Sequence, residues 1–360
     1  MTTRYVGPGG SDANSGLTWA LRKLTLNGVE DTPVVAGDTV YVGPGTYRET
    51  LTVDVSGTAG NPITYIGDYS GANTDGVGGV VRITGSNNDQ TATRANCITA
   101  TSKNYRTFQG FQFDMTSNIA LNLISPQNWV VQNCSFSEPV AVAYIQISGA
   151  SQSACTIQDS YFGPFNGRAI DITHTVTVDN TGHVIQNCVT NGMVGRHIST
   201  ERVGGITIKN CTLISGTVGI RVAVALTGGQ TVTVNNCILV GLISVALQAV
   251  NVGEIIENFN AFSSNVANRT NVDTGANSNA FPALFDPRWF FELVGGKGRM
   301  VSPSDLASYS QLVNLAGTSP TTTDLRGTAV IGAQREWGAL EYDPDLKLRA
   351  SRARFLIGIG

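Results

Sequence analysis

The sequence predicts an all-β protein, a right-handed parallel β-helix (solenoid) with a short N-terminal capping helix and an irregular C-terminal region. Three observations predict this class: a sequence motif that recurs about every 25 residues, an excess of glycine and a low fraction of charged residues. Glycine is 41 of 360 residues, and charged residues are 14%, against a usual charged fraction of about 25%. Exposed helical faces need charged side chains and glycine weakens helix interiors, so this composition argues against a mainly helical chain.

The recurring motif consists of an apolar residue, a polar residue, an Asn or Asp, and then a small or apolar residue. Its Asn or Asp is Asn133, Asp159, Asn187, Asn210, Asn236 or Asn258. The next residue is Cys134, Ser160, Cys188, Cys211, Cys237 or Phe259, and Phe111 fits one step earlier. A second motif follows the first at a nearly constant distance. It consists of short strands whose residues are expected to point inward, outward and inward, at 121–123, 145–147, 170–172, 198–200, 222–224 and 247–249.

A repeat this short, with two or three short strands, cannot bury its apolar face alone, whereas stacked coils can. Stacking places equivalent residues in columns along the axis, with neighbouring coils about 4.8 Å apart. A β-propeller is the main alternative, but its blades need about 40 residues, and a leucine-rich repeat would show its leucine pattern. The repeat therefore favours a single solenoid.

The chain divides into an N-terminal cap (1–35), the β-helix (36–262) and a C-terminal region (263–360). In the cap, residues 17–27 are expected to form a short helix over the first coil, since a capped end prevents edge-to-edge aggregation. In the C-terminal region, Ser302-Pro303 is expected to begin one amphipathic helix, and 330–342 to form a last strand pair. The basic tail is expected either to dock on an acidic partner or to fray.

The six cysteines have a structural explanation in this fold. Four of them share one inward column with Ser160, so we expect buried free thiols rather than disulfides. No CxxC or histidine cluster accompanies them, so no metal site is predicted. The Asn column predicts a ladder of turns whose stacked amides satisfy one another. Asp12-Ala-Asn14-Ser-Gly16 matches the first half of a calcium loop, but Lys23 stands where that loop needs a Glu, which favours a tight turn.

Three N-terminal sequence motifs resemble those of a known group of proteins. They are Tyr5-Val-Gly-Pro-Gly-Gly-Ser-Asp12, Ala36-Gly-Asp38-Thr-Val-Tyr-Val42-Gly-Pro-Gly45-Thr-Tyr47 and Ser56-Gly-Thr-Ala-Gly-Asn-Pro62-Ile-Thr-Tyr65. With the coil pattern of residues 96–260, they resemble pectate-lyase-like β-helix proteins, including polysaccharide lyases of the ninth family. The resemblance implies the fold and leaves the function open, because these proteins include lyases, hydrolases, epimerases and inert shafts. The coil lysines, Lys103 and Lys209, are not flanked by several aspartates as in those lyases.

Acid, histidine and arginine converge at one place in the aligned coils. The alignment puts Tyr144, His197 and Arg221 in one outward column and Gln146, Asp171 and Ser199 in the next, with Arg168 and Arg196 one coil apart beside them. The candidate catalytic residues are Asp171, His197 and Arg221, and the candidate ligand-binding residues are Tyr144, Arg168 and Arg196. The alternative interpretations are carbohydrate contact without catalysis and an ordinary ionised surface patch. No cofactor is predicted.

Several function classes lack their sequence signals. The net charge of −3 argues against a nucleic-acid binder. No apolar run approaches the roughly 18 residues of a membrane span, and the N-terminus does not resemble a secretory signal. Gly-x-Ser-x-Gly and His-Glu-x-x-His are both missing. A lyase needs a Lys or Arg base beside carboxylates, and a glycosidase needs two carboxylates, yet acidic residues are scarce in the coils.

These features predict a structural or host-adhesion component of a phage virion, such as a tail, neck or capsid appendage. Virion proteins fold and assemble in the host cytoplasm, so they need no signal peptide. The expected partners are other virion proteins, further copies of the chain in a homotrimer, and a cell-surface glycan. The alternative is a polysaccharide lyase or glycosidase that acts on a surface polysaccharide. The scarcity of carboxylates favours a scaffold over an enzyme.

Overall fold

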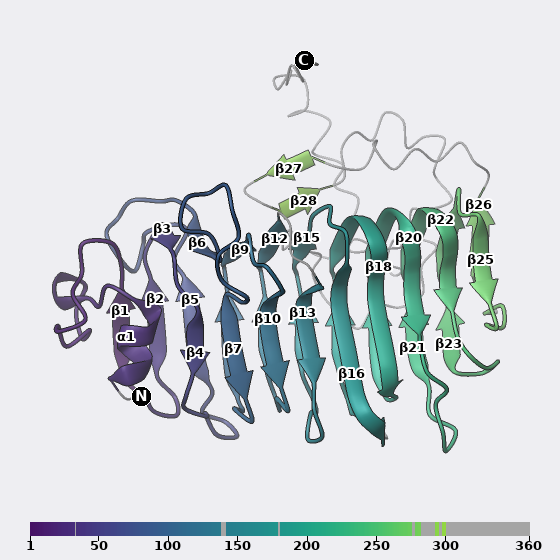
Figure 1. Ribbon diagram of the computed structural model, residues 1–360, viewed down its shortest axis with the longest axis horizontal. Coiled ribbons are helices and arrows are strands. Elements are labelled where there is room, and N and C mark those ends of the chain that lie inside the picture. The colour runs from purple at the N-terminus through teal and green to yellow at the C-terminus, as the bar shows by residue number, and fades with distance from the viewer. Residues whose placement is uncertain are drawn as a thin grey trace, which may run out of the picture.

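The chain folds as a right-handed parallel β-helix, as predicted (Figure 1). The computed structural model describes residues 1–32, 34–137, 142–178, 181–275, 278–281, 292–294 and 297–299. The expected helix after Ser302, the strand pair at 330–342 and the basic tail lie outside these residues.

Two long parallel sheets form the walls of the solenoid. The ten-stranded sheet consists of β1 (Thr3–Val6), β2 (Thr39–Val42), β5 (Ile63–Gly67), β8 (Arg106–Gln109), β11 (Val130–Gln132), β14 (Thr156–Gln158), β17 (Val184–Gln186), β19 (Ile206–Lys209), β21 (Val232–Asn235) and β23 (Ile255–Asn258). Each strand pairs in parallel with the equivalent strand of the next coil. Inward and outward residues alternate along these strands: the inward ones are buried and the outward ones are half-buried.

The second sheet has sixteen strands in two sets, which meet at a corner of each coil. One set is β3 (Gly45–Tyr47), β6 (Val81–Thr84), β9 (Gln112–Asp114), β12 (Ser135–Ser137) and β15 (Tyr161–Phe162). The other is β4 (Leu51–Val53), β7 (Ile98–Thr101), β10 (Ile119–Ile124), β13 (Ala143–Ser148) and β16 (Arg168–Val178). Longer strands then run through the corner without a break: β18 (Val189–Val203), β20 (Thr212–Val222) and β22 (Ile238–Gln248).

The last strands of this sheet are β24 (Ala261–Ser263), β25 (Ala267–Thr270) and β26 (Asn279–Phe281), and β27 (Glu292–Val294) pairs with β28 (Lys297–Arg299) as a separate antiparallel pair. The described residues contain one α-helix, α1 (Leu26–Asp31), and one turn of 3-10 helix, Trp19–Leu21.

The expected single helix over 17–27 is wrong in its bounds. Arg22 is extended, which separates the 3-10 turn from α1. Thr18 and Thr25 each cap the N-terminus of one of the two segments. The Thr18 hydroxyl accepts a hydrogen bond from the Leu21 amide, and the Thr25 hydroxyl accepts one from the Gly28 amide. Two N-cap threonines, seven residues apart, therefore start two separate helical segments where the sequence predicts one helix.

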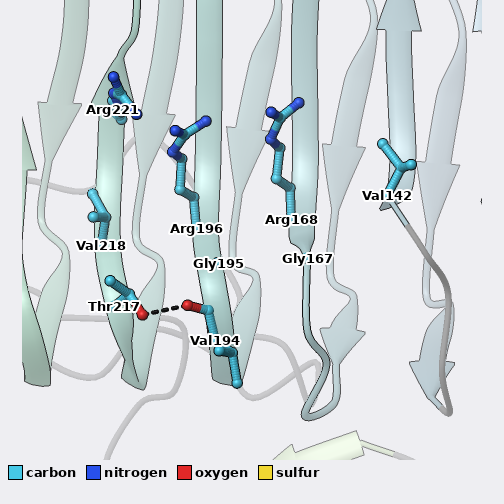
Figure 2. A pocket seen from close by; sticks show the side chains of 9 residues that line it. All are labelled: Val142, Gly167, Arg168, Val194, Gly195, Arg196, Thr217, Val218 and Arg221. Atoms are coloured by element: carbon cyan, nitrogen blue, oxygen red, sulfur yellow. Dashed lines mark hydrogen bonds between the residues drawn. The ribbon is translucent and has the colours of Figure 1, made fainter.

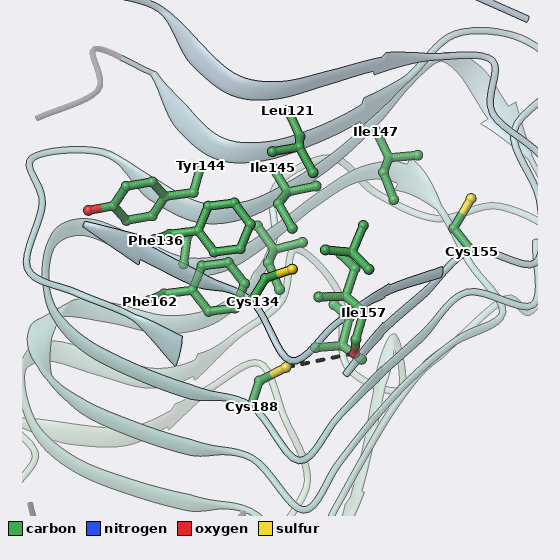
Figure 3. Close-up of a cluster of buried hydrophobic side chains, with 14 of the residues drawn as sticks. Leu121, Cys134, Phe136, Tyr144, Ile145, Ile147, Cys155, Ile157, Phe162 and Cys188 are labelled. Carbon is green, nitrogen blue, oxygen red and sulfur yellow. Dashed lines mark hydrogen bonds between the residues drawn. The ribbon is translucent and has the colours of Figure 1, made fainter. Parts of the chain in front are cut away.

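The core is built from columns of identical or similar side chains (Figure 3). Phe113, Phe136 and Phe162 lie in register in three successive coils, and their ring centroids are 5.1 and 4.7 Å apart. Offset stacking of this kind adds to the free energy gained by burying each ring. The length of the sequence repeat is thus the length of one coil, and it brings residues of the same kind into contact in neighbouring coils.

The turn column is confirmed over most of its length. Asn133, Asp159, Asn187, Asn210 and Asn236 all have φ between 51° and 55°, the left-handed region that Asn and Asp tolerate best among residues with a side chain. The last coil is shifted by one residue relative to the prediction. Phe259 occupies the turn position with φ 54°, and the buried Asn260 lies in the inward column, where its carboxamide oxygen accepts from the Cys237 amide at 2.8 Å.

All six cysteines are free and buried, as predicted. Burial raises the pKa of the Cys155 thiol to about 12 and also raises that of Cys97. We therefore expect a thiol reagent such as Ellman's reagent to label none of them in the native protein and all six after denaturation, because only an accessible thiolate reacts. Rapid labelling of the native protein would contradict this placement.

Candidate functional site

A groove of about 550 Å³ opens at the corner of the coils, over the start of β16 and the middle of β18 and β20 (Figure 2). We call it the arginine groove, because Arg168, Arg196 and Arg221 project into it. Gly167 and Gly195 form its floor, in neighbouring coils. A Cβ atom on Gly195 would lie 2.4 Å from the Gly167 carbonyl oxygen, so the floor must remain bare backbone.

The parallel register positions the three arginines. Arg168 pairs with Arg196 in the next coil, and Figure 2 shows their side chains side by side. Arg221 belongs to the following coil and lies three positions further along the strand, since it pairs with Ser199 and not with Arg196. Val142, Val194 and Val218 provide the apolar part of the lining. The groove thus combines a flat backbone floor, apolar walls and three cations.

Asp171 neutralises one of these cations. One of its carboxylate oxygens, Oδ2, accepts from Arg168 at 2.7 Å and from the Gln146 amide at 3.1 Å, and the side chain is fully buried. Burial raises the pKa of Asp171, and the charge of Arg168 opposes that rise. The other oxygen, Oδ1, has no hydrogen-bond partner among the described residues. Asp171 therefore fixes Arg168 in place from beneath the groove.

Arg196 and Arg221 have no ion-pair partner in the described part of the chain, although the charges of Asp171 and Glu201 act on Arg196 from a distance. Neither forms an ion pair or a side-chain hydrogen bond with any residue that the structure describes. The pKa of Arg196 is lowered, first by burial and then by the positive charges of Arg221 and Arg168. Two neighbouring guanidinium groups that lack a carboxylate partner are ready to bind an anion, which would relieve their mutual repulsion.

Two predicted site residues do not face the groove. Tyr144 and His197 do share a column, but it is an inward one, and both side chains are fully buried. The Tyr144 ring packs against Phe136 and Phe165, and His197 Nδ1 shares a hydrogen bond with the Thr190 hydroxyl. Their predicted placement on the outside is wrong. Arg221 lies instead in the outward column of Asp171 and Ser199.

The glycine floor and the valine walls were not predicted from the sequence. A signal for them exists, because the dipeptides Gly167-Arg168 and Gly195-Arg196 recur at the same position of consecutive coils. A glycine that precedes an outward arginine in two coils indicates a place where a ligand approaches the backbone.

The residues that the structure describes contain no cluster of three or more His, Cys, Asp or Glu side chains able to hold a metal ion. Within the same residues, no helix has the length and apolar character required to cross a membrane.

The buried histidines predict a loss of stability in acid. Burial lowers the pKa of His183 from 6.5 to about 4 and that of His197 from 6.5 to about 3. Below pH 6.5 the unfolded chain therefore binds protons that the folded chain excludes, so the stability present at neutral pH is lost as the pH falls toward these values. At about pH 5, each imidazole should lower the free energy of unfolding by about 2 kcal/mol.

Urea unfolding at neutral pH and at about pH 5 measures this effect. Replacing both histidines, His183→Gln with His197→Gln, removes the two titrating groups and should flatten the dependence of stability on pH. An equal loss in the parent protein and in the double variant would contradict the assignment.

The chain matches no protein-family model and no curated protein. Among solved structures, it resembles pectate lyase Pel9A with a TM-score of 0.52 and 16% identity, over 95% of this chain and 97% of that one. A rhamnogalacturonan lyase gives a TM-score of 0.46 and 14% identity over 97% and 98% of the two chains. An alginate lyase from Paenibacillus sp. str. FPU-7 gives a TM-score of 0.44 and 14% identity, over 75% of this chain and 99% of that one. The similarity to Pel9A confirms the fold predicted from the sequence, a parallel β-helix like that of pectate lyases.

Proposed function

We propose that this protein binds an acidic polysaccharide in the arginine groove and cleaves it by β-elimination. The observation that carries the proposal is the pair Arg196 and Arg221, two half-buried cations in an open groove that form no ion pair with the described residues. A uronate carboxylate matches the planar fork of a guanidinium group. The bare glycine floor and the valine walls suit the apolar face of a sugar ring.

The groove also contains groups suited to the reaction itself. Neutralising a uronate carboxylate lowers the pKa of the adjacent C–H group, and Arg221, which has no ion-pair partner among the described residues, is placed to do this. Arg196 lies in the coil between those of Arg168 and Arg221, and its pKa is lowered. It binds the carboxylate as a cation, and the fraction that has released its proton to solvent acts as the base. The base takes the proton, a C=C bond forms, the glycosidic C–O bond breaks and the departing oxygen takes a proton from water. The similarity to a pectate lyase is consistent with this class of reaction.

The second candidate is a glycan-binding component of a phage virion, a homotrimer that contacts other virion proteins and holds a host polysaccharide without cleaving it. One observation favours this function. Asp171 is buried and held by Arg168 and Gln146, so the groove offers no pair of free carboxylates for hydrolysis. In this case the arginine groove would be an adhesion site.

Incubation of the purified protein with polygalacturonate, alginate, gellan and hyaluronan distinguishes the two candidates. Cleavage by β-elimination creates a conjugated double bond, which absorbs in the ultraviolet, and it shortens the polymer. Binding that is not followed by an absorbance rise supports the adhesion function. If none of the four polymers is bound or cleaved, the arginine groove is not a site for acidic polysaccharides.

A further inference from the structure

A second groove, of about 520 Å³, lies over β3, β6, β9 and β12. We call it the neutral groove, because the charges of its lining residues Arg82, Asp89 and Asp114 are balanced once Arg48, which pairs with Asp89 from outside the lining, is included. Arg82 donates to Asp114 at 2.6 and 3.0 Å and to Asp89 at 2.5 Å, and Arg48 donates to Asp89 at 3.0 and 2.5 Å. The pKa of Asp89 is lowered to about 2 by Arg48 and Arg82. At neutral pH, two cations and two anions therefore balance.

The groups that remain for a ligand are uncharged. Thr46 and Ser137 line the neutral groove, and their hydroxyl groups form no hydrogen bond with the described part of the chain. Gln112, in register with Arg82 and Ser135, lies between them, and its amide makes only a long contact of 3.5 Å with Asp114. Hydroxyl and amide groups can each donate and accept, which is the capacity that sugar hydroxyls require.

The two grooves follow one another along the axis of the solenoid. The neutral groove lies on the first strand set and the arginine groove lies where the second set begins, and they share one coil, in which Ser137 lines the neutral groove and Val142 the arginine groove. Residues 138–141 between these two are outside the described part of the chain. From β3 to β20 is six steps between coils, about 29 Å along the axis at the usual strand spacing. One extended polysaccharide can therefore contact both grooves.

We infer that the neutral groove binds uncharged, hydroxyl-bearing sugar residues of the same polysaccharide whose acidic residue binds Arg196 and Arg221. This inference rests on the proposed function and narrows the substrate class to a heteropolysaccharide in which neutral and acidic residues alternate or repeat. A polymer with a carboxylate on every residue would place its negative charge beside Asp89, which is exposed and ionised, where both arginines are already paired with carboxylates.

Affinities for homopolymers and heteropolymers test the inference. The probes are polygalacturonate and alginate, which are acidic at every residue, and gellan and hyaluronan, which contain neutral residues. The variant Thr46→Val with Gln112→Leu removes hydrogen-bonding groups of the neutral groove while keeping side-chain size. It should weaken the binding of a heteropolymer about tenfold, on the basis of one or two lost hydrogen bonds, and leave the affinity for homopolymers unchanged.

Arg196→Ala serves as the comparison, because it should weaken the binding of both kinds of polymer. If the parent protein prefers homopolymers, or if the Thr46→Val, Gln112→Leu variant binds heteropolymers as tightly as the parent does, the neutral groove is not a sugar site. If Arg196→Ala also leaves every affinity unchanged, the proposed function fails as well. A thermal unfolding curve of each variant shows whether the fold is retained.

Discussion

Replacing Arg196 and Arg221 together by alanine is expected to weaken the binding of an acidic polysaccharide by about 100-fold or more. A hydrogen bond to a charged group contributes about 1.5–3 kcal/mol, and each 1.4 kcal/mol corresponds to a factor of about ten in Kd. Neither arginine forms an ion pair with a described residue, so a bound anion would be the direct ionic partner of both. If the protein cleaves the polymer, the same variant should lose its activity.

The effect on stability distinguishes a binding role from a structural one. Removing two like charges that repel one another should leave the free energy of unfolding unchanged or slightly higher, whereas removing a structural ion pair lowers it. Lys209→Ala is the matched control, because it removes a cation from the outward face of the ten-stranded sheet, away from the groove. A variant with both arginines replaced that binds as tightly as Lys209→Ala would contradict the assignment of the groove.

Glu30→Ala is expected to produce the largest loss of stability, about 3–5 kcal/mol. Glu30 in α1 and Arg106 in β8 are both buried and form a two-pronged ion pair with distances of 2.8 and 2.9 Å. The Tyr65 hydroxyl also donates to Glu30, at 2.7 Å. Without the carboxylate, Arg106 would remain as an unpaired charge in the core at the N-terminal end of the solenoid. Chemical denaturation measures the loss.

Asp31→Ala is the control for this prediction, since Asp31 is the exposed neighbour on the same helix. Replacing both members of the buried pair by methionine should recover part of the stability, because no unpaired charge then remains. Equal midpoints of denaturation for Glu30→Ala and Asp31→Ala would show that the ion pair does not stabilise the capped end.

The coil repeat was predictable because parallel stacking requires the same kind of residue at the same position of each coil. Asn187, for example, has the positive φ that its place in the repeat indicates, and its amide reaches Asp159 in the preceding coil at 3.0 Å. The one-residue shift at Phe259 was not predictable, because the sequence offers Asn258 for the turn column, whereas the structure places Phe259, a residue type that rarely takes a positive φ, at that turn.

The candidate site was predicted in part. The sequence brought Asp171, Arg168, Arg196 and Arg221 to one region, and the structure places them around one groove. His197 was misplaced because strict alternation of inward and outward residues fails at the corner of the coil, where β18 contains a shift of register between Met193 and Arg196. After that shift both His197 and Ile198 are fully buried, and no periodic pattern in the sequence indicates the shift.

The central claim is that Arg196 and Arg221 hold the acidic group of a polysaccharide. A crystal structure of the protein with a bound uronate-containing oligosaccharide, prepared from gellan, tests it most directly. The account predicts a carboxylate within hydrogen-bonding distance of both guanidinium groups and a sugar ring over Gly167 and Gly195. An oligosaccharide bound elsewhere on the molecule, with the arginine groove empty, would contradict it.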